Sequence, residues 1–362
     1  MVQLKSGLAA LLEHRCTASV DIAPGVQTPA RFSGAAAEHL ATRRAAGLFD
    51  FSFMYCVEIA GAGSQDFLHA LQTRAIDMLA CGRIAYTLLL REDGSVLIDA
   101  TVWRLGDDRY WLFTGRRADA AYLTSFARDY AVTLHDRSGS QSVIAVQGPA
   151  STAIIERVFS ARDPRALPYF GFTQLDYAGE ECWLARIGYS GERGYELVIA
   201  NAAAPMLWEA LLAAGAGCGL LECGFEAADS LRVEAGHILF TRELATAATP
   251  AELGFMRLVD SYRVDFRGAA ALRAQRWRAP ARRLIGLLPL QRANGEWRGQ
   301  GAAGDVVLMS RVRSPLLERD LALGFVPAGT VSGALVTLAN GERARVARLP
   351  FYDPARMLPR QD

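Results

Sequence analysis

The hydrophobic and polar residues of the chain alternate between strand-like and helix-like stretches. Short β-prone runs predict strands, and longer stretches with apolar residues at helical spacing predict helices. The predicted strands are residues 57–59, 86–90, 101–103, 110–113, 142–146, 182–185 and 197–200, and the predicted helices are residues 35–46, 64–73, 118–130, 150–158, 204–214 and 227–235. Because the two kinds alternate irregularly, the pattern favours a mixed α+β fold over a doubly wound sheet.

The last part of the chain has a different pattern. Short strands are predicted at residues 284–288, 305–309, 321–325, 334–338 and 344–347, separated by Gly and Pro turns. The basic, Trp-containing stretch 272–283 precedes them and contains Pro280, so it is the best candidate for a domain boundary. We therefore expect one domain over residues 1–278 and a small all-β domain over residues 279–362.

A glycine-rich segment, residues 186–197, separates two β-prone runs and reads Arg-Ile-Gly-Tyr-Ser-Gly-Glu-Arg-Gly-Tyr-Glu-Leu. Its three glycines, Gly188, Gly191 and Gly194, can supply turns with positive φ and a close approach of the backbone to a ligand. A glycine-rich hairpin without a ligand is the alternative. Tyr189 and Glu196 are the residues of this segment with the chemistry to hold a flat, polar ligand.

Composition narrows the function classes. The 362 residues contain 39 Lys and Arg against 38 Asp and Glu, so the chain is nearly neutral and offers no electrostatic footprint for nucleic acid or an anionic membrane. The six cysteines form no C-x-x-C or Cys/His cluster, which argues against a metal site and a disulfide framework. Residues 1–15 contain only one short apolar patch, so we expect a short amphipathic helix rather than a signal peptide or membrane span. We expect a cytoplasmic protein without a metal.

Asp99 is the carboxylate that stands out, because it lies alone within the apolar run Val96–Val102. Burying an unpaired charge costs several kcal/mol, so this residue needs either a partner or a function. A buried Asp that caps a backbone turn is the structural alternative.

Four aromatic residues, Phe49, Phe51, Phe53 and Tyr55, recur at every second position. In an extended segment they would share one face. Such a wall could attract a methylated ammonium or sulfonium group by cation–π interaction, or it could simply be part of the hydrophobic core.

The glycine-rich segment resembles the RTGYTGEDGFEL signature of the glycine-cleavage T-protein (aminomethyltransferase) family. Further segments resemble that family in the same order: residues 38–50 its EHxAxRxxxGLFD element, residues 81–99 its GxxxY segment ending in a catalytic Asp, residues 146–149 its QGP turn, residues 224–235 its GLGARDxLRLEA helix, and residues 349–354 part of its closing barrel. Collinear motifs over roughly 320 residues are far more specific than one pattern match.

The resemblance implies three subdomains arranged as a cloverleaf around a folate channel, with a C-terminal small β-barrel. It also implies a tetrahydrofolate-dependent enzyme that transfers a one-carbon unit.

A carboxylate can accept both the N3–H and the 2-amino group of a reduced pterin, and Glu196 is our candidate for that role. Tyr86 and Tyr189 would flank the ring. Asp99 matches the catalytic Asp, whose fixed charge would stabilise positive charge that develops during transfer. Arg360 would pair with the glutamate carboxylates of folate, with Arg356 as its rival.

The sequence also departs from the family pattern. At positions where the family has polar groups or glycine, this chain has Phe53 for His, Tyr55 for Gly, Ile98 for the first Asp of a pair, Thr114 for Asn and Ala228 for Arg. We therefore predict transfer from a small N-, S- or O-methylated substrate to tetrahydrofolate, and we do not expect a lipoylated carrier protein as partner. The alternatives are aminomethyltransfer as in the glycine cleavage system and a non-catalytic folate-binding regulatory protein.

Two further sets of residues complete the expectations. The candidate substrate pocket comprises Phe51, Phe53, Tyr55 and His237, the last because similar segments occur in folate domains of sarcosine-type demethylating enzymes. A structural role for His237 is the alternative. Asp229 and Arg232 lie three residues apart on a predicted helix, a spacing that favours a surface ion pair over a folate contact.

Overall fold

The computed structural model describes residues 6–23, 26–160, 163–275, 277–292, 301–303, 306–338 and 341–361. The α-helices are α1 (Ala9–Glu13), α2 (Ala35–Arg44), α3 (Ser64–Leu71), α4 (Asp119–Phe126), α5 (Ser151–Val158), α6 (Ala204–Gly215), α7 (Phe225–Glu234) and α8 (Ala269–Gln275). The strands up to residue 222 are β1 (Ala18–Ala23), β2 (Val26–Arg31), β3 (Ala46–Asp50), β4 (Tyr55–Ala60), β5 (Ile84–Leu90), β6 (Val96–Arg104), β7 (Arg109–Thr114), β8 (Thr133–Asp136), β9 (Gln141–Gln147), β10 (Phe172–Tyr177), β11 (Glu180–Ala185), β12 (Gly194–Ala200) and β13 (Leu220–Glu222). The later strands are β14 (Arg282–Pro289), β15 (Gly301–Ala303), β16 (Val306–Ser314), β17 (Arg319–Pro327), β18 (Leu335–Thr337) and β19 (Arg343–Ala347).

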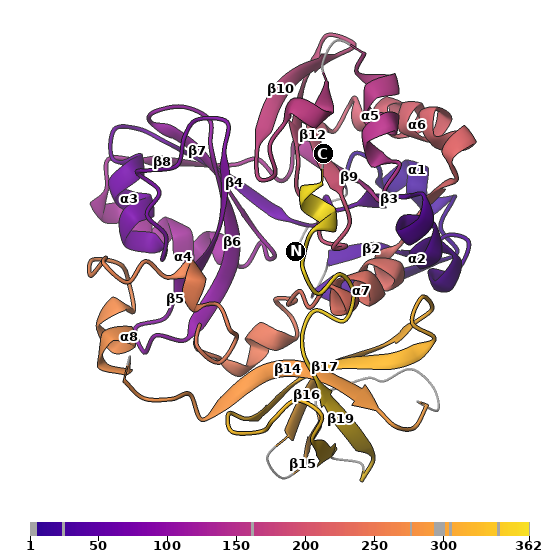
Figure 1. The fold of residues 1–362 in the computed structure, drawn as a ribbon. Helices are drawn as coiled ribbons and strands as arrows, with labels where there is room; N and C mark the ends of the chain where they lie inside the picture. Colours follow the sequence, from indigo (N-terminus) through magenta and orange to yellow (C-terminus); the bar gives the residue numbers. More distant parts are fainter. Residues whose placement is uncertain are drawn as a thin grey trace.

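Two sheets organise the first part of the chain. A six-stranded sheet has the order β10-β11-β12-β9-β3-β13, and a five-stranded sheet has the order β5-β6-β7-β4-β8. All their pairings are antiparallel except that of β13 with β3. Figure 1 shows the five-stranded sheet in one lobe and the six-stranded sheet, with α5 and α6, in a second lobe.

One face of each sheet contributes to a shared aromatic core, and we call these the inner faces. Trp103 and Trp111 of the five-stranded sheet are buried together with Trp183 of the six-stranded sheet, and the rings of Trp111 and Trp183 lie 5.1 Å apart. Because side chains alternate along a strand, every second residue of these strands points into this core or its rim. The five-stranded and six-stranded sheets therefore contact one another through their inner faces.

The opposite, outer faces are buried as well, because helices cover them. On the five-stranded sheet, Ile98 and Val102 pack with Phe67 and Leu71 of α3. On the six-stranded sheet, apolar residues of β9, β11 and β12 pack with α5 and α6, which bring Ile154, Leu207 and Trp208. The mixed fold expected from the sequence is therefore confirmed, with both sheets buried on two sides.

The C-terminal strands form one sheet with the order β15-β16-β17-β14-β19-β18. Within the described residues its edge strands β15 and β18 are not paired with one another, so the sheet is open and the barrel is not confirmed. This sheet forms the third lobe in Figure 1, next to α7, and the C-terminal segment, residues 349–361, runs from it towards the six-stranded sheet.

Several expected elements differ from the observed ones. The aromatic stripe is not one extended segment, since β3 ends at Asp50, a turn bonds the Met54 N–H to the Phe51 carbonyl, and β4 begins at Tyr55. The strand expected at 101–103 belongs to the longer β6, so Asp99 lies inside a strand. The expectations for residues 1–5 and for Asp305 lie outside the described residues.

The expected ion pair between Asp229 and Arg232 is present, but the prediction that it lies on the surface is wrong. Arg232 does donate to Asp229, at 2.8 Å, but its side chain has no exposure. It also donates to Glu243 at 3.0 Å and to the Ser310 hydroxyl of β16 at 2.6 Å. α7 lies between the second lobe and the C-terminal sheet, and the spacing of two residues on a helix does not reveal what covers them.

In the part of the chain that the structure describes, no helix is long and apolar enough to cross a membrane.

Candidate functional site

Asp99 lies on the inner face of the five-stranded sheet. It shares this face with Thr101 and Trp103, of which Trp103 belongs to the aromatic core, and it is opposite Leu88 of β5. The Tyr86 hydroxyl donates to one of its carboxylate oxygens at 3.0 Å. Burial raises the pKa of Asp99 to about 6, although the bond from Tyr86 lowers it. Asp99 is half-buried, so its carboxylate combines a partial loss of water with access to a ligand.

Tyr86 and Tyr189 share the surroundings of Asp99. Burial raises the pKa of both phenols, and the negative charge of Asp99 raises them further. Tyr189 comes from the glycine-rich segment between β11 and β12, and its hydroxyl donates to the Ile238 carbonyl at 2.6 Å. The ring of Tyr86 packs edge-on against Phe255. The fold thus brings together three residues from two lobes.

Glu196 lies on the inner face of the six-stranded sheet. The β-register places it between Ala185 of β11 and Ala145 of β9, so its cross-strand neighbours are small. The residue is only 6% exposed, and burial raises the pKa of its carboxyl to about 7. Within the described residues its carboxylate has no hydrogen-bond partner, whereas buried carboxylates normally have one. Glu196 is therefore a buried acceptor with capacity for a ligand.

The glycines of the glycine-rich segment leave space for another side chain of the protein and not for a ligand. Gly191 has a φ of +82°, a conformation that favours glycine. A Cβ added to Gly188 or Gly194 would overlap the carboxamide of Gln147, a fully buried side chain that bonds the Ile187 carbonyl and the Ser190 hydroxyl. We expected these glycines to let the backbone approach a ligand closely. In the structure the backbone instead approaches the side chain of Gln147, which holds the segment in place.

His237 lies against Tyr189. The two rings stack with centroids 5.8 Å apart, and the His237 Nδ1–H donates to the Tyr189 carbonyl at 3.1 Å. Burial lowers the pKa of the imidazole to about 4, so the ring is neutral at physiological pH. A neutral ring that donates from Nδ1 keeps Nε2 as an acceptor.

The other residues of the candidate substrate pocket lie in two different hydrophobic clusters. Phe51 and Phe53 pack edge to face at 5.8 Å, and Phe53 continues onto Phe225 of α7. Tyr55 belongs to the outer-face core of the five-stranded sheet and is paired with Thr114. The structure therefore does not bring Tyr55 together with the two phenylalanines.

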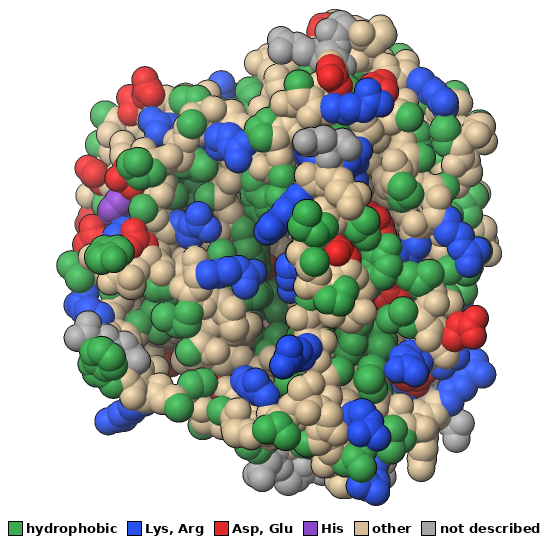
Figure 2. Space-filling view, viewed as in Figure 1, with side chains coloured by type: hydrophobic (Ala, Val, Ile, Leu, Met, Phe, Trp, Pro, Cys, Tyr) green, Lys and Arg blue, Asp and Glu red, His purple; other side chains and the backbone are tan. Residues whose placement is uncertain are grey.

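Arginines gather near the C-terminus. The exposed Arg360 has its guanidinium 6.0 Å from the ring centre of Tyr169, and Arg356 donates to the Ala235 carbonyl at 3.4 Å. Burial lowers the pKa of Arg356, and the positive charges of Arg257 and Arg360 lower it further. Figure 2 shows Arg side chains around the hollow at the centre of one face. Sequence reasoning missed Arg257, for which no motif gave a signal.

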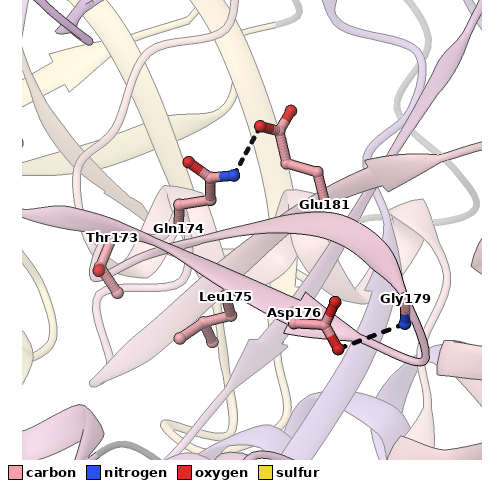
Figure 3. A pocket seen from close by; sticks show the side chains of 6 residues that line it. All are labelled: Thr173, Gln174, Leu175, Asp176, Gly179 and Glu181. Atoms are coloured by element: carbon pink, nitrogen blue, oxygen red, sulfur yellow. Dashed lines mark hydrogen bonds between the residues drawn. The ribbon is translucent and has the colours of Figure 1, made fainter.

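An open depression on the β10–β11 hairpin is a poor rival for the site. Figure 3 shows Asp176 turned back onto the backbone N–H of Gly179 and Glu181 bonded to Gln174. Both carboxylates already have partners. The described residues also contain no group of three or more His, Cys, Asp and Glu side chains that could hold a metal ion.

Comparisons with known proteins agree with one another. The model of the GCVT N-terminal domain family matches residues 13–263. The aminomethyltransferase of Moorella thermoacetica is 34% identical over 90% of this chain and 91% of its own length, and that of Bacillus subtilis is 32% identical over 91% and 93%. The crystal structure of the glycine cleavage system aminomethyltransferase T from Bartonella henselae has a TM-score of 0.86 at 27% identity, covering 97% of this chain and 98% of that one.

These relatives overturn our expectation that a lipoylated carrier is not a partner, because aminomethyltransfer is the reaction that uses one. Three of the five substitutions behind that expectation do not reach the inner faces, whereas Phe53 packs against the aromatic core there and Ala228 belongs to it. Ile98, Tyr55 and Thr114 all lie on the outer-face side of the five-stranded sheet, where Ile98 and Tyr55 pack in the core beneath α3 and Thr114 pairs with Tyr55.

Asp99, Tyr86, Tyr189 and Glu196 lie on or beside the inner faces. With the family model over more than half of the chain and curated relatives over nine-tenths of it, the chain belongs to the glycine-cleavage T-protein (aminomethyltransferase) family.

Proposed function

We propose that this protein is a tetrahydrofolate-dependent aminomethyltransferase that takes the one-carbon unit of an aminomethyl group carried on a lipoyl arm and releases ammonia. The observation that carries the proposal is Glu196, a buried carboxylate without a hydrogen-bond partner in the described residues, on the sheet face opposite Asp99. The names of the relatives support the donor.

Glu196 fits the pterin end of a folate. Two adjacent N–H donors match the two oxygens of one carboxylate, and a charge-assisted pair in a partly dry site is strong. Tyr189 and Tyr86 would flank the ring. Arg356 and Arg360 would meet the glutamate carboxylates at the other end, because both lie at the C-terminal segment where cations gather.

Asp99 would provide the charge that the reaction needs. Tetrahydrofolate, when bound, supplies the nitrogen that accepts the one-carbon unit. Asp99 is ionised above about pH 6, and Tyr86 holds its carboxylate in place. A fixed anion stabilises positive charge that develops on the reacting atoms, which is worth a few kcal/mol in a preorganised site.

A small methylated donor was our first prediction from the sequence, and its support was the set of substitutions discussed above. The comparisons favour the alternative, aminomethyltransfer. They also favour an enzyme over a non-catalytic folate-binding protein, since the relatives are named aminomethyltransferases.

Two finer features of the architecture belong to the same proposal. We place the folate-binding domain at residues 1–278, with three subdomains around a folate channel, and the C-terminal domain at residues 279–362. The end of α8 at Gln275 and the start of β14 at Arg282 support that boundary.

The test is a pair of parallel incubations with tetrahydrofolate. One contains aminomethylated lipoyl carrier protein and the other an N-methylated amino acid. Both are assayed for 5,10-methylenetetrahydrofolate and for 5-methyltetrahydrofolate, the product of methyl transfer without an oxidant, and ammonia is measured in the first. We expect product only with the carrier. Product only with the small donor would restore the demethylase reading, and folate binding without product from either would favour the non-catalytic one.

A further inference from the structure

We propose that Arg43 and Tyr352 are positioning residues for the reaction, which lock the glycine-rich segment to the C-terminal segment and so hold Tyr189 in place. The proposal rests on the proposed function, in which Tyr189 flanks the folate ring. Neither residue needs to touch a ligand for this role.

The first observation is that every donor of Arg43 is already used. Its side chain is 1% exposed. Nε donates to one oxygen of Glu234 at 2.9 Å, and Nη2 lies 2.8 Å from the same oxygen and donates to the Leu231 carbonyl at 3.3 Å. Nη1 donates to the Ser190 carbonyl at 3.0 Å and to the Glu192 carboxylate at 2.8 Å. Four acceptor atoms thus surround the guanidinium and each of its nitrogens has a partner, which leaves no open side for a substrate.

The second observation is that the partners of Arg43 belong to two different segments of the chain. Ser190 and Glu192 follow Tyr189 in the glycine-rich segment, while Leu231 and Glu234 belong to α7. The Ser190 hydroxyl is held from the other side by Gln147 at 2.8 Å. The backbone next to Tyr189 is therefore fixed between α2 and β9, and a planar guanidinium fork is the group that can reach all these acceptors at once.

The third observation is that Tyr352 closes the cluster from the C-terminal segment. Its ring centre lies 4.0 Å from the Arg43 guanidinium carbon, a cation–π geometry. Its hydroxyl hydrogen-bonds with Glu192, where burial raises the pKa of the carboxyl and the bonds from Arg43 and Tyr352 oppose that rise. The backbone N–H groups of Phe351 and Tyr352 donate to the Glu234 carbonyl at 2.9 and 3.0 Å. One cluster thus joins the segment that bears Tyr189 to the segment that bears Arg356 and Arg360.

The other oxygen of Glu234 anchors this cluster. It lies 3.1 Å from His39 Nε2 and accepts from the Ser314 hydroxyl of β16. His39 in turn contacts Ser230 at 2.7 Å. Because all these groups are buried, they have few alternative partners, and the arrangement is fixed.

The experiment compares three variants of the full chain. Tyr352→Ala removes the ring and hydroxyl from a half-buried position, Tyr352→Phe keeps the ring, and Tyr177→Ala removes a half-buried tyrosine far from the cluster. For Tyr352→Ala we expect the KM for tetrahydrofolate to rise about tenfold with kcat changed less than threefold, because ground-state positioning is lost. Amide hydrogen exchange in residues 187–193 should also become faster. Tyr352→Phe should lie between Tyr352→Ala and wild type, and Tyr177→Ala should match wild type in KM and in exchange of that segment.

The outcomes separate this inference from the proposed function. If the wild type neither binds nor uses tetrahydrofolate, the proposed function fails, yet faster exchange at 187–193 in Tyr352→Ala would still support the coupling of the two segments. If Tyr352→Ala keeps wild-type KM and wild-type exchange there, the inference is overturned. Arg43→Lys is a further variant that keeps the positive charge but loses the planar guanidinium. It tests the buried member of the pair and should raise the KM for tetrahydrofolate at least as much as Tyr352→Ala does.

Discussion

At the scale of the residue, Glu196 combines burial with an unused hydrogen-bonding capacity. Replacing it with alanine should weaken tetrahydrofolate binding by more than about 1.5 kcal/mol, because two donors of the pterin would lose a charged acceptor. Isothermal titration calorimetry measures this directly. Glu181→Ala on the neighbouring strand β11 is the control, since that side chain is exposed and should change affinity by less than a factor of two. Equal affinities in wild type and Glu196→Ala would remove the residue from the site.

The same burial has a cost in stability that depends on pH. The pKa of Glu196 is raised to about 7 in the folded protein, so folding is most favourable below the ordinary carboxyl pKa, and that contribution is lost as the pH rises through 7. Glu196→Gln cannot ionise. Its stability relative to wild type should therefore increase between pH 5 and pH 8 by on the order of 2 kcal/mol, in denaturant titrations at both pH values. A pH-independent difference would show that Glu196 titrates normally.

At the scale of the element, β6 separates its residues onto two faces with different functions. Asp99 is on the inner face and Ile98 on the outer one, under α3. Restoring the family's first carboxylate by Ile98→Asp should destabilise the protein by about 3 kcal/mol or more without raising activity, because a charge would enter an apolar core. Ile98→Val, the control, should cost about 1 kcal/mol. Higher activity in Ile98→Asp would show that this position reaches the site.

Helix α7 is held by a buried ion pair. Arg232→Met should lower the free energy of unfolding by about 3–5 kcal/mol, because it leaves the carboxylate of Glu243 buried without its cation. Arg267→Met, which breaks an exposed contact of 3.5 Å with Glu92, should cost less than about 1 kcal/mol. Chemical denaturation of both variants provides the measurement. A similar loss in both would mean that burial of the Arg232 pair adds nothing.

Periodicity predicted most helices to within a few residues, because amphipathic stretches such as α3 and α5 bury one face. It missed β1, β2, β3, β8, β10, β13 and β15, some of which are short edge strands whose apolar signal is weak. Motifs predicted Asp99, Tyr86, Tyr189 and Glu196 as site residues. They could not show that Ile98 and Thr114 lie away from Asp99, since that follows from strand register and from which helix covers each face. The role of Arg43 was equally invisible, because its partners come from distant segments.

At the scale of the whole molecule, the candidate site depends on three lobes being held together. Asp99 and Tyr86 come from one lobe, Glu196 and Tyr189 from the second, and the C-terminal segment reaches them from the third (Figure 1). The lobes are joined by buried polar clusters around Arg43 and Arg232, in addition to the shared aromatic core. A site built between lobes suits a long ligand with apolar, polar and anionic parts, and it places Asp99 in one lobe and Glu196 in another.

That separation gives the most direct test of the central claim, that Asp99 acts on the transfer step. Asp99→Asn keeps the shape of the side chain and removes its charge. We expect kcat for transfer from aminomethylated lipoyl carrier to tetrahydrofolate to fall by about 100-fold or more, because only stabilisation specific to the transition state speeds the chemical step. The affinity for tetrahydrofolate should change by less than about tenfold. Unchanged turnover with a lower melting temperature would contradict the account and leave Asp99 a structural residue.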